Sequence, residues 1–149
     1  DGSALARGRG EILAYFPWRC PWWILLVNPG IHVSTAWAYG SLRLPDRPPA
    51  VDLRAALLRA ADDPAALALL LHNDFEKPVM DAHPEILAVK RRMLDAGAAG
   101  ALMSGSGSSV FGLFTDERSV RACAEGFPAG QLLSITRPGF VPESVVRES

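Results

Sequence analysis

The chain has 149 residues, of which 49% are apolar and 21% charged, and its formal net charge is -1. This length is sufficient for one domain with a buried core, and the composition is typical of a globular soluble protein. The balance of charge offers no broad basic surface of the kind that nucleic acid binding requires. The basic residues form short, separated clusters, which we interpret as solvated faces. They are Arg7/Arg9, Arg43/Arg47 and Lys90-Arg91-Arg92.

Membrane and targeting signals are missing from the sequence. No apolar run reaches the roughly 18 residues of a membrane span, and the N-terminus lacks the basic region and apolar core of a signal peptide. We therefore expect a cytoplasmic protein without a membrane partner. The two cysteines, Cys20 and Cys123, match no metal or redox spacing, which favours idle thiols and leaves a disulfide open.

The first third of the chain predicts a hairpin and a central strand. Residues 3–16 contain two strand-like runs around a Gly-containing turn at 7–10. Residues 22–27 form an unbroken apolar run of strand length, which ends at the turn sequence 28–30. Ser34 or Thr35 can then cap a short helix that runs through Tyr39 and is closed by Gly40.

Helices dominate the middle of the chain, after a proline-rich loop at 42–49. Residues 52–61 and 64–71 predict helices capped by Asp52 and Asp63, and a further segment opens at Asn73 and is interrupted by Pro78. Another helix begins at His83-Pro84 and runs to Leu94. The remaining elements are a strand at 98–103, a strand at 110–114, a helix at 116–126 capped by Asp116, and a strand at 132–137, with a loop from Pro138 onward. This order predicts an α+β fold, close to a ferredoxin-like arrangement, with helices packed on one face of a mostly antiparallel sheet.

The Gly/Ser turn, residues 104–109, is the most specific local signal. Its small side chains let backbone N–H groups approach an anion, as in a nest, and the hydroxyls of the four serines add donors. A plain hairpin turn without a ligand fits the pattern equally well. The turn lacks the lysine of a Walker loop, and it joins two strands where a dinucleotide fingerprint needs a strand and then a helix.

The segment 28–39 runs from a strand through a turn to a helix N-terminus, where free N–H groups favour a polar ligand. Thr35 and Tyr39 are four residues apart and share one helix face, which would suit a ligand with both a polyol and a flat base. The residues alone favour a plainer interpretation, in which Ser34 and Thr35 are caps and the aromatic rings only pack.

The histidines and the acidic cluster at 73–76 give weaker signals. His32 lies alone near a turn, and His72 and His83 have no partner at metal-ligand spacing, so no metal site is predicted. The carboxylates of Asp74 and Glu76 could serve chemistry, but we prefer helix capping and a solvated first turn.

Taken together, these segments resemble the family of 4-diphosphocytidyl-2-C-methyl-D-erythritol kinases, within the GHMP kinase superfamily. The resemblance is carried, in chain order, by ALARGRGE at 4–11, NPGIHVSTA at 28–36, NDFE at 73–76, HPEI at 83–86 and GAAGALMSGSG at 97–107. It covers the chain to about Phe114. Five segments in the right order are far more specific than any one of them.

The resemblance implies a GHMP kinase C-terminal domain over residues 1–149, in an enzyme that transfers the γ-phosphoryl group of ATP, with Mg²⁺, to a hydroxyl of the methylerythritol moiety. The Gly/Ser turn matches the superfamily's third motif, near the phosphates, through Ser104, Gly105, Ser106, Gly107 and Ser108. Thr35 matches a position that contacts the methylerythritol end of the substrate. Tyr39 matches an aromatic position that stacks on cytosine, which contributes on the order of 1–3 kcal/mol.

In this family the phosphate-binding loop, the catalytic Asp and the active-site Lys lie in the N-terminal half, with the Asp a few residues upstream of Asp1. We therefore expect no catalytic residue in this chain and no kinase activity from it alone. The chain begins with Asp1 and not with Met, as would a domain cut from a longer protein. The surface that met the missing half should be apolar and open to self-association.

Two other functions remain open. A different GHMP kinase, acting on mevalonate or homoserine, is compatible with the Gly/Ser turn alone, although the segments at 29–36 and 73–76 argue against it. A free-standing ferredoxin-like module that binds a small ligand or drives oligomerisation is compatible with the missing catalytic half.

Overall fold

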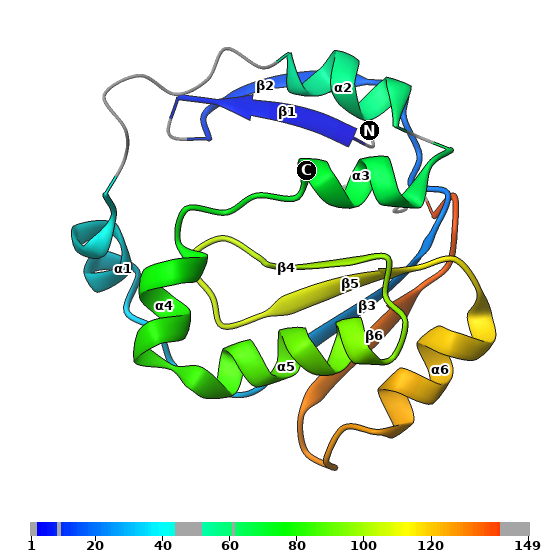
Figure 1. The fold of residues 1–149 in the computed structure, drawn as a ribbon. Coiled ribbons are helices and arrows are strands. Elements are labelled where there is room, and N and C mark those ends of the chain that lie inside the picture. The colour runs from blue at the N-terminus through cyan, green and yellow to red at the C-terminus, as the bar shows by residue number, and fades with distance from the viewer. Residues whose placement is uncertain (1–2, 9, 44–51, 61, 141–149) are drawn as a thin grey trace, which may run out of the picture.

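The computed structural model describes residues 3–8, 10–43, 52–60 and 62–140 (Figure 1). The strands are β1 (Ser3–Arg7), β2 (Ile12–Phe16), β3 (Trp23–Asn28), β4 (Gly100–Met103), β5 (Val110–Phe114) and β6 (Leu132–Thr136). The helices are α1 (Thr35–Ser41), α2 (Leu53–Arg59), α3 (Pro64–Leu70), α4 (Glu76–Ala82), α5 (Pro84–Asp95) and α6 (Glu117–Glu125).

A four-stranded antiparallel sheet forms the centre of the molecule, with the strand order β4-β5-β3-β6. β3 is an inner strand, which pairs with β5 on one side and with β6 on the other. Its position agrees with the unbroken apolar run from which the strand was predicted. The run β3, α5, β4, β5, α6, β6 follows the ferredoxin-like order of strands and helices. The predicted α+β fold with a mostly antiparallel sheet is confirmed.

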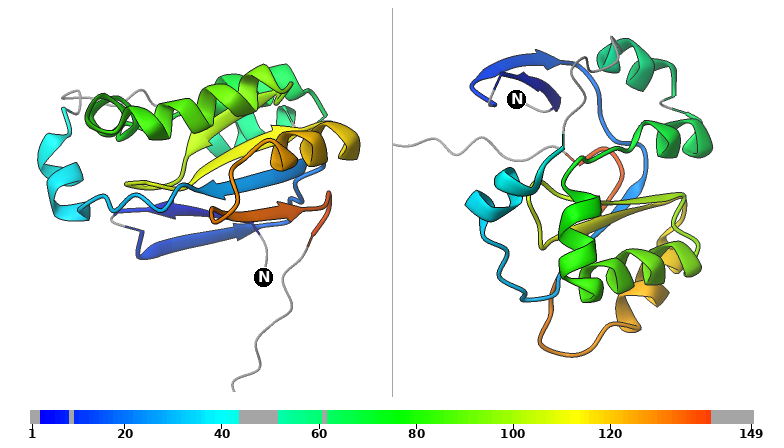
Figure 2. Two further views of the ribbon diagram at one scale, coloured as in Figure 1. Left: turned by 90° about the horizontal axis from the view of Figure 1, so that it is seen from below. Right: turned by 60° about the vertical axis from the view of Figure 1, so that its left-hand side comes forward.

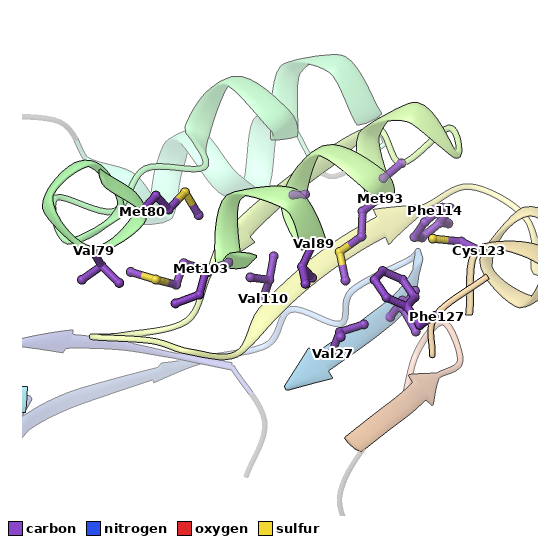
Figure 3. Packing of buried hydrophobic residues seen from close by; sticks show 14 of the residues in the cluster. Val27, Val79, Met80, Val89, Met93, Met103, Val110, Phe114, Cys123 and Phe127 are labelled. Carbon is purple, nitrogen blue, oxygen red and sulfur yellow. The ribbon is translucent and has the colours of Figure 1, made fainter. Parts of the chain in front are cut away.

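The main core lies between this sheet and α4, α5 and α6. Figure 2 (left) shows α5 and α6 together on one side of the sheet. Figure 3 shows Met93 of α5 beside the strands that carry Val27, Val110 and Phe114, and all four side chains are fully buried. Gly112 lies under α5, since a Cβ there would be 3.0 Å from the sulfur of Met93. The predicted helical layer on one face is therefore present and closely packed.

The opposite face of the sheet is covered at one end by α3. A Cβ at Gly100 would lie 2.8 Å from a methyl group of Leu71 and 3.0 Å from the Cβ of Ala68. Gly100 pairs with Leu113, and Leu113 is buried in a second, smaller cluster with Leu67 of α3. The helix pattern alone did not indicate this second layer, because the face that a helix covers depends on the path of the chain.

The hairpin β1–β2 forms a separate two-stranded sheet beside α2 (Figures 1 and 2). The guanidinium of Arg54 lies 5.5 Å from the centre of the Phe16 ring and joins the two elements. Ile12, Leu13 and Tyr15 of β2 are exposed by 58%, 50% and 61%. Because successive residues of a strand point to opposite faces, both faces of the hairpin carry exposed apolar side chains.

Four predicted helix caps are confirmed. The side chains of Ser34, Asp52, Asp63 and Asp116 accept hydrogen bonds from the backbone N–H groups of the first turns of α1, α2, α3 and α6. The prediction that Gly40 closes α1 is wrong, because the helix continues through Ser41, whose hydroxyl donates to the carbonyl of Trp37.

The ends of most other elements shift by at most two residues from those predicted. The segment from Asn73 differs more, because α4 begins at Glu76, and the predicted interruption at Pro78 is wrong. Pro78 lies in the first turn of α4, where a missing N–H removes no helical hydrogen bond. Most of the proline-rich loop and of the C-terminal tail lies outside the described residues. Both cysteines are free thiols, and burial raises the pKa of each. In the part of the chain that the structure describes, no helix has the length and apolar character to cross a membrane.

Candidate functional site

The Gly/Ser turn is the loop of the β4–β5 hairpin. The N–H of Ser104 donates to the carbonyl of Ser109 at 2.8 Å, and the N–H of Gly107 donates to the carbonyl of Ser104 at 3.1 Å. Gly105 and Gly107 have φ values of 56° and 93°, in the region that favours glycine. Ser104 and Gly105 are exposed, whereas Ser108 is buried. The turn thus presents its first half to solvent and packs its second half inward.

The N-terminus of α1 meets this turn, although the two are far apart in sequence. The hydroxyl oxygens of Thr35 and Ser106 are 3.3 Å apart. Asn28, at the end of β3, supports the same junction: its amide donates to the hydroxyl of Ser109 at 3.2 Å, and its carbonyl oxygen accepts from the N–H of Gly30 at 2.8 Å. The structure therefore brings together the two segments that the sequence indicated.

The segment 73–76 contacts the turn from the other side. The amide of Asn73 donates to the carbonyls of Met103 and Gly105, at 2.7 and 2.8 Å. One carboxylate oxygen of Glu76 accepts from the N–H of Met103 at 2.9 Å, and the other lies 2.6 Å from Nζ of Lys90. The side chains of Glu76 and Lys90 are only 17% and 22% exposed.

These contacts correct two expectations. Glu76 does not lie in a solvated first turn, and Lys90 does not belong to a solvated basic face, because the two side chains pair with each other. The two partners of Glu76, Lys90 and Met103, are 14 and 27 residues away from it in the sequence, so helix periodicity could not have predicted these contacts. The signal that was available is the segment NDFE itself, which the sequence singled out but did not connect to the turn.

Aromatic rings join α1 to the helices beside it. The rings of Tyr39 and Phe75 meet edge to face, with centres 4.9 Å apart and planes at 78°. Trp37 and His83 meet in the same way at 6.1 Å and 85°. Tyr39 is nevertheless 60% exposed, so much of its ring remains available to a flat ligand.

A hollow of about 390 Å³ lies between the end of α1 and the start of α4, and its size is within the range of small-molecule sites. It is lined by Ser41, Arg43, His72, Asn73, Asp74, Lys77, Pro78 and Asp81. Four of these residues pair on the surface, His72 with Asp74 at 2.9 Å and Lys77 with Asp81 at 2.8 Å. Within the described ranges, no group of three or more His, Cys, Asp or Glu side chains is arranged to hold a metal ion.

Residues 53–130, more than half of the chain, match the sequence pattern of the family described as GHMP kinases C terminal. The chain belongs to this family. It is 46% identical over 120 residues to a 4-diphosphocytidyl-2-C-methyl-D-erythritol kinase of Pelobacter propionicus, and the match covers 80% of this chain and 41% of the relative. The chain therefore spans less than half the length of this curated relative.

Solved structures of several kinases resemble the chain, among them the following two. A crystal structure of 4-(cytidine 5'-diphospho)-2C-methyl-D-erythritol kinase matches with a TM-score of 0.72 and 32% identity, over 93% of this chain and 50% of the other. A homoserine kinase from Cytophaga hutchinsonii matches with a TM-score of 0.67 and 24% identity, over 93% and 49% of the two chains. The second likeness is evidence of the fold alone.

Proposed function

We propose that the chain is the C-terminal domain of a kinase that transfers the γ-phosphoryl group of ATP to a hydroxyl of 4-diphosphocytidyl-2-C-methyl-D-erythritol. The observation that carries this proposal is the contact between Thr35 and Ser106, at 3.3 Å. It joins a predicted substrate segment to a predicted phosphate-side turn. The relative from Pelobacter propionicus and the first solved structure, both named for this activity, support the choice of substrate.

The proposed site has two walls, α1 with Thr35 and Tyr39 on one side and the Gly/Ser turn on the other, and each wall binds a different part of the ligand. Tyr39 offers an exposed ring for the cytosine base, and stacking of this kind contributes on the order of 1–3 kcal/mol. Thr35 offers a hydroxyl to the methylerythritol end. The Gly/Ser turn, through Ser104, Gly105 and Ser106, offers hydroxyl and backbone N–H donors on the phosphate side, while Gly107 and Ser108 close the turn against the core.

Phosphoryl transfer depends on positioning and on neutralising the charge of the phosphates. ATP and Mg²⁺ would supply the phosphoryl group and that neutralisation. The described residues include no cluster of metal ligands, and the turn provides donors without a cationic side chain. In this proposal the catalytic groups lie in an N-terminal portion of the enzyme, so the chain carries no catalytic residue of its own and does not turn over ATP alone.

The same proposal gives the hairpin β1–β2 a partner. Exposed apolar side chains on both faces of a two-stranded sheet favour burial against another surface. We assign this role to the N-terminal portion of the enzyme, and to self-association where that portion is absent. A monomer at micromolar concentration in light scattering would contradict the self-association. The reaction itself belongs in the cytoplasm, where ATP is available.

A hybrid enzyme tests the function. It joins the chain to the N-terminal portion of the Pelobacter propionicus relative, which precedes the matched region. We expect release of ADP with 4-diphosphocytidyl-2-C-methyl-D-erythritol and none above background with homoserine or mevalonate. Equal or faster release with homoserine or mevalonate would contradict the proposed substrate. A folded hybrid that releases no ADP with any of the three would contradict the function.

A further inference from the structure

Residues 73–76 contact both walls of the proposed site from the start of α4. Asn73 and Glu76 hold the Gly/Ser turn, and Phe75 holds the ring of Tyr39. We propose that Asn73, Phe75 and Glu76 are positioning residues, which set the turn and Tyr39 at a fixed spacing for one ligand. This inference rests on the proposed function for its purpose, but its structural part can be tested without any ligand.

Asn73 fixes the first half of the turn. Its one amide group bonds to two carbonyls, that of Met103 at the end of β4 and that of Gly105 within the turn. Its carbonyl oxygen accepts from the N–H of Phe75 at 3.0 Å, which orients the side chain that makes these bonds. Every polar atom of the amide thus has a role, and all the bonds lead either to the turn or to residue 75.

Glu76 adds a second support at the same place. The two side chains share the backbone of Met103: its N–H donates to Glu76, and its carbonyl accepts from Asn73. Nζ of Lys90, on α5, lies 2.6 Å from the second carboxylate oxygen of Glu76 and so orients the carboxylate. A largely buried ion pair contributes little net stability compared with apolar packing, because both charges must be desolvated. What the pair provides is a fixed acceptor for Met103, which favours a positioning role.

Phe75 acts on the other wall. Its ring meets that of Tyr39 edge to face at 4.9 Å, so it limits the angle that the exposed tyrosine ring can take. Residues 73, 75 and 76 lie within four consecutive residues that lead into α4, so one short segment sets the spacing between the turn and Tyr39. A base on Tyr39 and a phosphate at the turn would then be held at a constant separation.

Amide hydrogen exchange in the 149-residue chain tests the first part. The amides of Met103, Ser104 and Gly107 all donate within the structure. Asn73→Asp keeps the shape of the side chain but removes both donated bonds, and it should speed exchange at these amides about tenfold or more. Exchange in β3 should stay unchanged. Unaltered exchange in the turn, or an equal increase in β3, would overturn the proposal.

Glu76→Gln provides a rescue test. It retains an acceptor for Met103 but leaves the ammonium of Lys90 without its counter-charge, so exchange in the turn should rise. Adding Lys90→Met removes the unpaired charge and should return the exchange rate toward that of the original chain. Glu117→Gln, in an exposed pair with Arg121 on α6, is the matched control and should leave the turn unaffected. Failure of the double variant to recover would contradict the assigned roles.

Kinetic constants of the hybrid enzyme test the second part. Phe75→Leu should raise KM for the cytidyl substrate several-fold without changing KM for ATP. Asn73→Asp should lower kcat and leave KM for the cytidyl substrate nearly unchanged. For Phe75→Leu, a purely structural role would reduce the active fraction and move neither KM, and that result would overturn the proposal. For Asn73→Asp, kcat is calculated per correctly folded active site, and an unchanged kcat on that basis would overturn it. An inactive unmodified hybrid contradicts the proposed function, whereas the support of the turn is decided by hydrogen exchange.

Discussion

The Gly/Ser turn and α1 meet at one pair of hydroxyls, but they are held in place by different kinds of contact. Polar side chains hold the turn: Asn73, just before α4, bonds to Met103 and Gly105, and the largely buried Glu76 of α4 bonds to Met103. α1 contributes one fully buried residue, Ala38, to the main core, and the rings of Trp37 and Tyr39 on its exposed surface also join it to its neighbours. α1 and α4 both have seven residues, and a helix this short depends on contacts with the rest of the fold for its stability. The turn is therefore held by several polar bonds, whereas α1 is held by one buried alanine and a few aromatic contacts.

This difference has a consequence for ligand binding. A rigid turn costs little entropy when a ligand binds to it, whereas a lightly held helix must be ordered. Aromatic contacts such as those of Tyr39 and Trp37 contribute about 0.5–1.5 kcal/mol each. The contrast predicts that substitutions at the turn destabilise the whole domain, and that substitutions in α1 act locally.

Loss of the carboxylate of Glu76 should have the largest effect. Glu76→Ala removes the acceptor for Met103 and leaves the ammonium of Lys90 unpaired, which should lower the free energy of unfolding by about 3 kcal/mol. Urea denaturation followed by circular dichroism measures this change. Glu117→Ala, in the exposed pair on α6, should cost less than about 0.5 kcal/mol. Equal losses for the two variants would show that the buried support has no special importance.

A methyl group in the turn should have the next largest effect. At Gly107, where φ is 93°, a Cβ would lie 3.0 Å from the sulfur of Met103, so Gly107→Ala combines backbone strain with crowding and should cost about 2–3 kcal/mol. At Gly105, where φ is 56°, the space is open, and Gly105→Ala should cost about 1 kcal/mol. Thermal unfolding measures the stability of both variants. Because backbone strain is present in both and crowding only at Gly107, the difference between them gives the cost of crowding. A larger loss of stability for Gly105→Ala would contradict the packing described.

Two helix caps compare α1 with a well-packed helix. Asp63→Ala removes an acceptor for two N–H groups of α3, which contributes to the second core cluster, and should lower global stability by about 1 kcal/mol. Ser34→Ala should loosen α1 with a global change below about 0.5 kcal/mol. Fluorescence of Trp37 cannot be separated from that of the other tryptophans, so amide exchange of residues 35–41 is the appropriate local measure. A global loss from Ser34→Ala as large as that from Asp63→Ala would mean that α1 is as firmly held as α3.

The smallest expected effect on stability is at the junction itself. Thr35→Val keeps the shape of the side chain but removes the hydroxyl that meets Ser106, and it should change the free energy of unfolding by less than about 0.5 kcal/mol. In the hybrid enzyme it should nevertheless raise KM for the cytidyl substrate. Loss of stability without a change in KM would mean that the contact is only structural.

Local chemistry made much of the fold predictable. Aspartate and serine before apolar helices correctly indicated four caps, and the glycines of the turn correctly indicated a hairpin loop. Gly40 misled because a glycine favours a helix end most strongly where the backbone takes a positive φ, and Gly40 does not take one, so that α1 continues through Ser41. The cover of Gly100 by α3 depends on tertiary contacts that no local pattern contains.

The site was only partly accessible to the same reasoning. The shared helix face of Thr35 and Tyr39 follows from their spacing, but the approach of Thr35 to Ser106 spans 71 residues. The roles of Glu76 and Lys90 were missed for a related reason. A carboxylate at a helix start and a lysine in a basic run each have a common solvated explanation, and only their mutual contact replaces it.

The effect of Tyr39→Ala on the kinetics of the hybrid enzyme is the most direct test of the proposed site. The ring is 60% exposed, so its removal should leave the domain folded. If cytosine stacks on it, KM for the cytidyl substrate should rise about tenfold or more while KM for ATP stays constant. An unchanged KM for the cytidyl substrate, or an equal rise in both constants, would contradict the assignment of this surface to the cytidyl substrate.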